Sequence, residues 1–150
     1  MNQKHIFFEN ATSYKLAAKL EMPETTVIGY VLFAHCFTCN ENFLAVLNIG
    51  CALNKARIAV LRFDFTGLGE SEGAFEITNF SSNVQDLVAA AGYLEEHHET
   101  PKIIIGHSLG GAAVVFAAQF LPSIKAVAIQ GALSNPQHVS HHLKSGIKEI

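Results

Sequence analysis

Hydrophobic positions follow two alternating patterns along most of this chain. Short continuous apolar runs, which are typical of buried strands, alternate with longer segments in which apolar residues recur at helical spacing. The runs cover residues 27–34, 57–63, 103–105 and 125–130, and the helical segments cover about 42–55, 79–97 and 112–118. Strands separated by helices favour parallel pairing through right-handed crossovers. Because strands that are apolar on both sides must be covered on both sides, helices are expected on both faces of the sheet.

The first part of the chain has a different pattern. Two short runs, 4–9 and 15–22, are separated by the turn-forming residues 10–13, and Pro23 ends the second run. This arrangement predicts a hairpin at the start of the domain. The chain is therefore expected to form a single α/β domain over residues 1–150, with a mostly parallel sheet.

One predicted junction between a strand and a helix contains a motif that points to catalytic chemistry. A β-branched run leads into Gly106-His107-Ser108-Leu109-Gly110, a G-x-S-x-G sequence, and an alanine-rich helical pattern follows at once. A turn this sharp strains the serine backbone and presents the hydroxyl beside the free N–H groups of the next helix. Ser108 is therefore a candidate nucleophile, and His107 is expected to point away from it. The alternative is that Ser108 merely caps the helix.

Composition narrows the classes of partner. The chain is 49% hydrophobic and 15% charged, and its net charge of −3 comes without a basic stripe, which argues against nucleic acid. The longest run of apolar residues and glycine, 109–118, is shorter than the roughly 18 residues of a membrane span. The N-terminus lacks the apolar core of a signal peptide. Three cysteines with no disulfide-like spacing favour a reducing, cytoplasmic compartment.

Four polar or turn-forming positions follow the predicted parallel strands directly. They are His35, Asp64, Ser108 and Gly131. Ligand sites in open parallel sheets lie at the carboxyl ends of the strands, so these positions should share one edge. Asp64 is expected to anchor its loop through backbone N–H groups.

These motifs resemble the α/β-hydrolase superfamily. The match is with serine aminopeptidase S33-like hydrolases, in particular those fused to an osmotically inducible protein C (OsmC) domain, and it rests on 32–39, 61–73, 79–84 and the G-x-S-x-G junction. The resemblance implies hydrolysis of a small ester or amide through an acyl-enzyme on Ser108, without cofactor or metal. It also implies that the N–H groups of Leu109 and Phe37 stabilise the oxyanion, and that His35 shapes its loop rather than acting as the base.

The partners that a serine nucleophile needs are not evident. The superfamily order is serine, then acid, then histidine, but no Asp follows Ser108 and the only later Glu is Glu149. The candidate substitute bases are His138, His141 and His142. We therefore expect an N-terminal part of a longer hydrolase, ending after about the sixth strand and lacking the acid and histidine loops. Its edge strand, 125–130, would be exposed and open to self-association.

Other interpretations remain open. The chain could be an inactive binding or assembly module, and Cys36-x-x-Cys39 could be a redox pair, although it lacks the Gly-Pro of thioredoxins. A zinc site on the three late histidines and a dinucleotide-binding loop at 67–72 are both disfavoured, the first for lack of nearby Cys, Asp or Glu and the second by Glu72. Asp86 is expected on the solvent or loop side of its helix, without a role.

Overall fold

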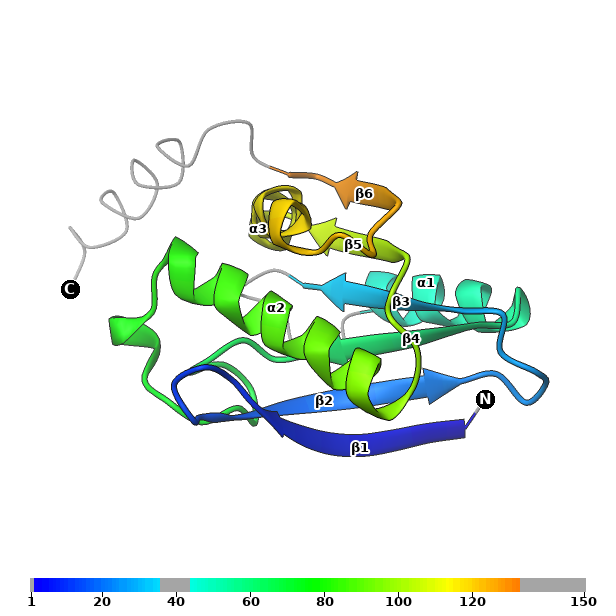
Figure 1. Cartoon of the computed structure of the whole chain (residues 1–150), viewed down its shortest axis with the longest axis horizontal. Coiled ribbons are helices and arrows are strands. Elements are labelled where there is room, and N and C mark those ends of the chain that lie inside the picture. The colour runs from blue at the N-terminus through cyan, green and yellow to red at the C-terminus, as the bar shows by residue number, and fades with distance from the viewer. Residues whose placement is uncertain (1, 36–43, 133–150) are drawn as a thin grey trace.

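The computed structural model describes residues 2–35 and 44–132, except the side chains of Ala45 and Leu109. Six strands form one sheet in the order β1-β2-β4-β3-β5-β6 (Figure 1). The strands are β1 (Asn2–Glu9), β2 (Lys15–Met22), β3 (Gly29–Ala34), β4 (Ile58–Phe63), β5 (Ile103–His107) and β6 (Ala126–Gln130). The helices are α1 (Leu44–Lys55), α2 (Phe80–His97) and α3 (Leu109–Ala117), with short 3-10 turns η1 (Phe75–Ile77) and η2 (Ala118–Phe120).

The sheet is mixed in the way that the sequence predicts. β1 and β2 form an antiparallel hairpin, and β2 joins β4 antiparallel. The four strands β4, β3, β5 and β6 run parallel. The predicted α/β fold with a mostly parallel sheet and an N-terminal hairpin is therefore confirmed.

Apolar side chains alternate between the two faces of the sheet and form two cores. The larger core places Leu61, Phe63 and Ile104 against Leu87 of α2 and Val114 of α3. The smaller core holds Val31, Phe33 and Val60 against Val46 of α1. Helices thus cover both faces, as fully apolar strands require.

Helix α2 begins at a well-defined cap. Its cap is Asn79, whose side chain accepts a hydrogen bond from the Ser82 N–H at 3.0 Å, while the Ser82 hydroxyl accepts from the Asn79 N–H at 2.9 Å. Asn79 is placed to reach the N–H three residues on, so the pair forms a reciprocal capping box.

Candidate active site

The predicted strand, turn and helix around Ser108 are present. β5 ends at His107, α3 begins at Leu109, and Ser108 alone makes the turn. Its backbone has φ 55° and ψ −121°, in the left-handed half of conformational space that residues with a side chain rarely occupy. Such a conformation costs about 1–3 kcal/mol and persists only where the surrounding fold enforces it.

Two glycines let β5 and α3 approach closely enough to enforce that turn. A Cβ atom at Gly106 would lie 2.6 Å from the Gly110 carbonyl oxygen and equally close to Val114. A Cβ atom at Gly110 would lie 2.6 Å from the carbonyl oxygens of both Ala34 and His35. Helix α3 therefore starts directly against the carboxyl end of β3.

Both backbone polar groups of Ser108 have hydrogen-bond partners. The Ser108 N–H donates to the Gln130 carbonyl at 2.9 Å, and the Ser108 carbonyl accepts from the Gly111 N–H at 2.9 Å. A helix start has no intrahelical acceptor for its first N–H groups, which in α3 are those of Leu109 and Gly110. Among the residues that the structure describes, the Ser108 side chain makes no capping hydrogen bond. Ser108 thus occupies the N-cap position of α3, but its side chain does not cap the helix.

His35 and Asp64 meet at the same edge of the sheet. His35 Nε2 lies 3.0 Å from Asp64 Oδ1, and both side chains are buried. Asp64 Oδ2 also accepts from the Glu70 N–H at 3.1 Å, which confirms that Asp64 anchors its loop. The pair fixes His35, the last described residue before 36–43, beside the start of α3.

Asp86 was misplaced by the sequence pattern. It is fully buried, and its carboxylate accepts hydrogen bonds from the Thr66 N–H (2.8 Å), the Thr66 hydroxyl (3.0 Å) and Asn10 Nδ2 (2.8 Å). Asp86 thus lies on the loop side of its helix, which was one of the two positions expected, and not on the solvent side. Its hydrogen bonds give it a structural role, which was not expected. It lies three residues after Asn83 and four before Ala90 on the buried stripe of α2, a signal that could have identified it.

The burial of Asp86 makes a pH-dependent prediction. Desolvation raises its pKa above the ordinary 3.8, and the hydrogen bonds from Thr66 and Asn10 oppose that rise only in part. A raised pKa means that the folded state holds the proton more tightly, so this contribution to stability is full below pH 3.8 and is lost as pH rises through the folded-state pKa. We therefore expect the wild type to lose stability relative to Asp86→Asn between acidic and neutral pH. Urea denaturation of both proteins across that range checks this, and a wild type that gains on the variant as pH rises would contradict it.

Several predicted site residues lie outside the described residues. They are Phe37, Cys36, Cys39, His138, His141 and His142. The oxyanion role of Phe37, the redox pair and the substitute bases thus stay predictions. Within residues 2–35 and 44–132, no three His, Cys, Asp or Glu side chains gather as metal ligands do. No helix of that part is long and apolar enough to cross a membrane.

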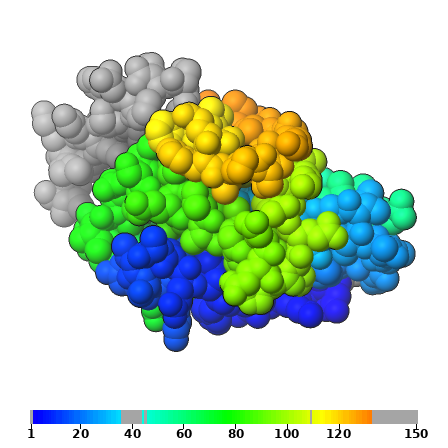
Figure 2. All heavy atoms as spheres, viewed as in Figure 1, coloured from blue at the N-terminus to red at the C-terminus, as the bar shows by residue number. Residues whose placement is uncertain are grey.

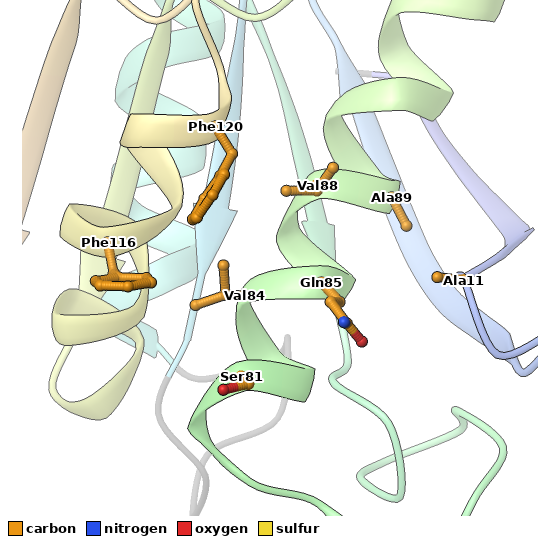
Figure 3. A pocket seen from close by; sticks show the side chains of 8 residues that line it. All are labelled: Ala11, Ser81, Val84, Gln85, Val88, Ala89, Phe116 and Phe120. Carbon is orange, nitrogen blue, oxygen red and sulfur yellow. The ribbon is translucent and has the colours of Figure 1, made fainter.

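An apolar groove of about 480 Å³ lies between α2 and α3 (Figure 3). Phe116 of α3 and Phe120 of η2 face Val84 and Val88 of α2 across it. None of the predicted site residues lines this groove. We therefore place the candidate site not in this groove but at the carboxyl edge of the sheet, where Ser108, His35 and Asp64 lie.

Known proteins resemble this chain in sequence and in fold. The sequence profile of the family described as "Serine aminopeptidase, S33" matches residues 25–148. The esterase domain of a Rhodothermus marinus protein is 48% identical and has a TM-score of 0.78, with 94% of this chain and 55% of that one covered. Est1E from Butyrivibrio proteoclasticus, solved with ferulic acid bound, is 28% identical with a TM-score of 0.73, over 81% of this chain and 50% of that one.

A curated relative agrees with these structures. The monoacylglycerol lipase of Mycolicibacterium smegmatis is 28% identical over 116 residues, which are 75% of this chain and 41% of that protein. This chain thus spans about half the length of the relatives it matches. The profile match extends over most of the chain and the strand, turn and helix around Ser108 fit it, so the chain belongs to the serine aminopeptidase S33 family of α/β hydrolases.

Proposed function

We propose that this protein is a serine hydrolase that cleaves a small ester or amide through an acyl-enzyme on Ser108. The observation that carries the proposal is the backbone of Ser108, strained at φ 55° between β5 and α3. The fold holds this strain in place through the close packing of Gly106 and Gly110, although an unstrained turn would be more stable. The relatives named as esterases and a lipase favour an ester over a peptide as substrate.

The reaction would proceed in two steps. Ser108 Oγ attacks the acyl carbonyl carbon and loses its proton to a base, and the alcohol or amine leaves with a proton as the acyl-enzyme forms. Water then attacks the same carbon, and the acid is released as the Ser108 hydroxyl re-forms. In both steps the N–H groups of Leu109 and Phe37 would stabilise the negative oxygen.

The proposal requires a base that accepts the proton of the Ser108 hydroxyl. Within the described part of the chain the Ser108 hydroxyl has no hydrogen-bond partner, and the buried His35 is bonded to Asp64. The candidates are His138, His141 and His142, or a residue from another chain. The cysteine pattern favours the cytoplasm as the compartment.

A fluorophosphonate probe tests the proposal because it labels only an activated serine. We expect the protein to be labelled, Ser108→Ala to lose all labelling, and Ser81→Ala, a change of an exposed serine on α2, to keep it. A folded wild type that stays unlabelled would favour the alternative, an assembly module without catalysis. Comparing p-nitrophenyl acetate with an aminoacyl p-nitroanilide would then separate an esterase from an aminopeptidase.

A further inference from the structure

One buried pair ties the loop after β4 to the carboxyl end of β3. The parallel register sets the last residues of the two strands, Ala34 and Phe63, level with each other. His35 and Asp64 follow them directly, and both side chains are buried, with His35 Nε2 3.0 Å from Asp64 Oδ1. A carboxylate accepts hydrogen bonds and does not donate them, so the His35 N–H is the donor. Such a charge-assisted bond, shielded from water, is among the stronger contacts in a protein.

The loop itself holds the Asp64 carboxylate in place. Asp64 Oδ2 accepts a hydrogen bond from the Glu70 N–H at 3.1 Å, and a Cβ atom at Gly69 would overlap that carboxylate. The Ser71 hydroxyl donates to the Asp64 carbonyl at 2.6 Å and accepts from the Ala17 N–H of β2 at 2.9 Å. The loop is thus folded around Asp64 and bonded to β2, so the carboxylate is a fixed anchor for the His35 ring.

His35 in turn borders the first turn of α3. Its carbonyl oxygen lies so close to Gly110 that a Cβ atom there would be only 2.6 Å away. On the β6 side, the Ser108 N–H donates to the Gln130 carbonyl at 2.9 Å. The start of α3 is thus held between the ends of β3 and β6, and a shift of this turn would disturb one of these contacts. Whatever fixes the His35 ring therefore also limits where the first N–H groups of α3 can lie.

We propose that Asp64 is a positioning residue that acts through His35 on the first turn of α3. It thereby sets where the Leu109 N–H lies relative to the Ser108 hydroxyl. The inference rests on the proposed function, in which that N–H stabilises the oxyanion. Such donors act only when they are held within about 0.5 Å of the productive geometry. Loss of the anchor should therefore lower kcat, which depends on the transition state, and leave KM nearly unchanged.

The first turn of α3 can be followed by NMR whether or not the protein is catalytically active. Asp64→Asn keeps the size of the side chain, but it leaves one accepting oxygen for two donors, the N–H groups of His35 and Glu70. We expect the backbone amide signals of Leu109 and Gly110 to shift in this variant. They should shift further in Asp64→Ala, which removes both bonds. Circular dichroism checks that each variant is folded.

The matched control is Asp86→Asn. Asp86 is a second buried carboxylate that accepts from the loop after β4, with the Thr66 N–H 2.8 Å away, but it bonds to Asn10 rather than to His35. Asn10 belongs to the β1–β2 turn, and Figure 2 shows that turn, in dark blue, lying against α2, in green. The control perturbs the same loop without touching the pair, so the two amide signals should stay in place. Unmoved signals in both Asp64 variants, or equal shifts in the control, would overturn the inference.

Steady-state kinetics with p-nitrophenyl acetate test the consequence for catalysis. We expect Asp64→Asn to lower kcat by about 10–100-fold, the range that a small misplacement of a catalytic group produces, with KM within about threefold of the wild type. Asp86→Asn should keep both constants near those of the wild type. Equal kcat values in the two variants would overturn the positioning role and leave the proposed function standing. A folded wild type that is neither labelled nor active would instead contradict the proposed function, and the amide signals would still decide whether Asp64 positions α3.

Discussion

Glu21→Gln is expected to lower the free energy of unfolding by about 3–5 kcal/mol, the cost typical of breaking a buried ion pair by removing one partner. Glu21 on β2 and Arg62 on β4 form an ion pair in which both side chains are fully buried. Among the described residues, Arg62 Nε and Nη1 have no hydrogen-bond partner. The neutral amide would thus leave a guanidinium charge buried with nothing to offset it. Urea denaturation, followed by circular dichroism, measures the loss.

Two controls show whether the loss of stability comes from the unpaired buried charge or would follow from any substitution. The double variant Glu21→Leu with Arg62→Met removes both charges and should recover most of the lost stability, because desolvating the pair already offsets much of its attraction. Glu70→Gln breaks the exposed pair between Glu70 and His5, 3.5 Å apart, and should cost no more than about 1 kcal/mol. A Glu21→Gln variant as stable as the Glu70→Gln variant would contradict the prediction.

Gly110→Ala is expected to lower the stability of the protein and to disturb the candidate site. The new Cβ atom would lie 2.6 Å from two backbone carbonyl oxygens, those of Ala34 and His35, which cannot rotate away as a side chain could. Forcing the start of α3 away from β3 should cost about 1–3 kcal/mol or more, as overpacking does in tightly packed cores. It should also weaken fluorophosphonate labelling, because the Leu109 N–H would move relative to Ser108.

The matched control is Gly92→Ala. Gly92 lies within α2, is exposed, and would have nothing within 4 Å of its new Cβ atom. Alanine is the better helix former, so this change should raise stability by about 1 kcal/mol and leave labelling unchanged. Thermal melts of the two variants, run with the labelling assay, make the comparison. If Gly110→Ala behaves like Gly92→Ala, the close crossing of β3 and α3 does not constrain the site.

The sequence by itself determined the elements and the chemistry that local pattern carries. Continuous apolar runs separated by helical periodicity predicted the parallel sheet and its two covered faces, since burial on both sides leaves no polar alternation. The G-x-S-x-G sequence predicted the turn at Ser108 because small neighbours are needed within a few residues of it. Both patterns are local. Each lies within about one helix or strand, the range over which hydrophobic periodicity and steric contacts between neighbouring residues act.

Only the tertiary structure decided which distant residues meet. Glu21 and Arg62 are 41 residues apart and Asn10 and Asp86 are 76 apart, and no spacing in the sequence links either pair. The insertion of β4 between β2 and β3 brings the first pair together, and the packing of α2 beside the β1–β2 turn brings the second. A buried charge is stable only beside its partner, and that partner is set by strand order and helix packing rather than by local pattern.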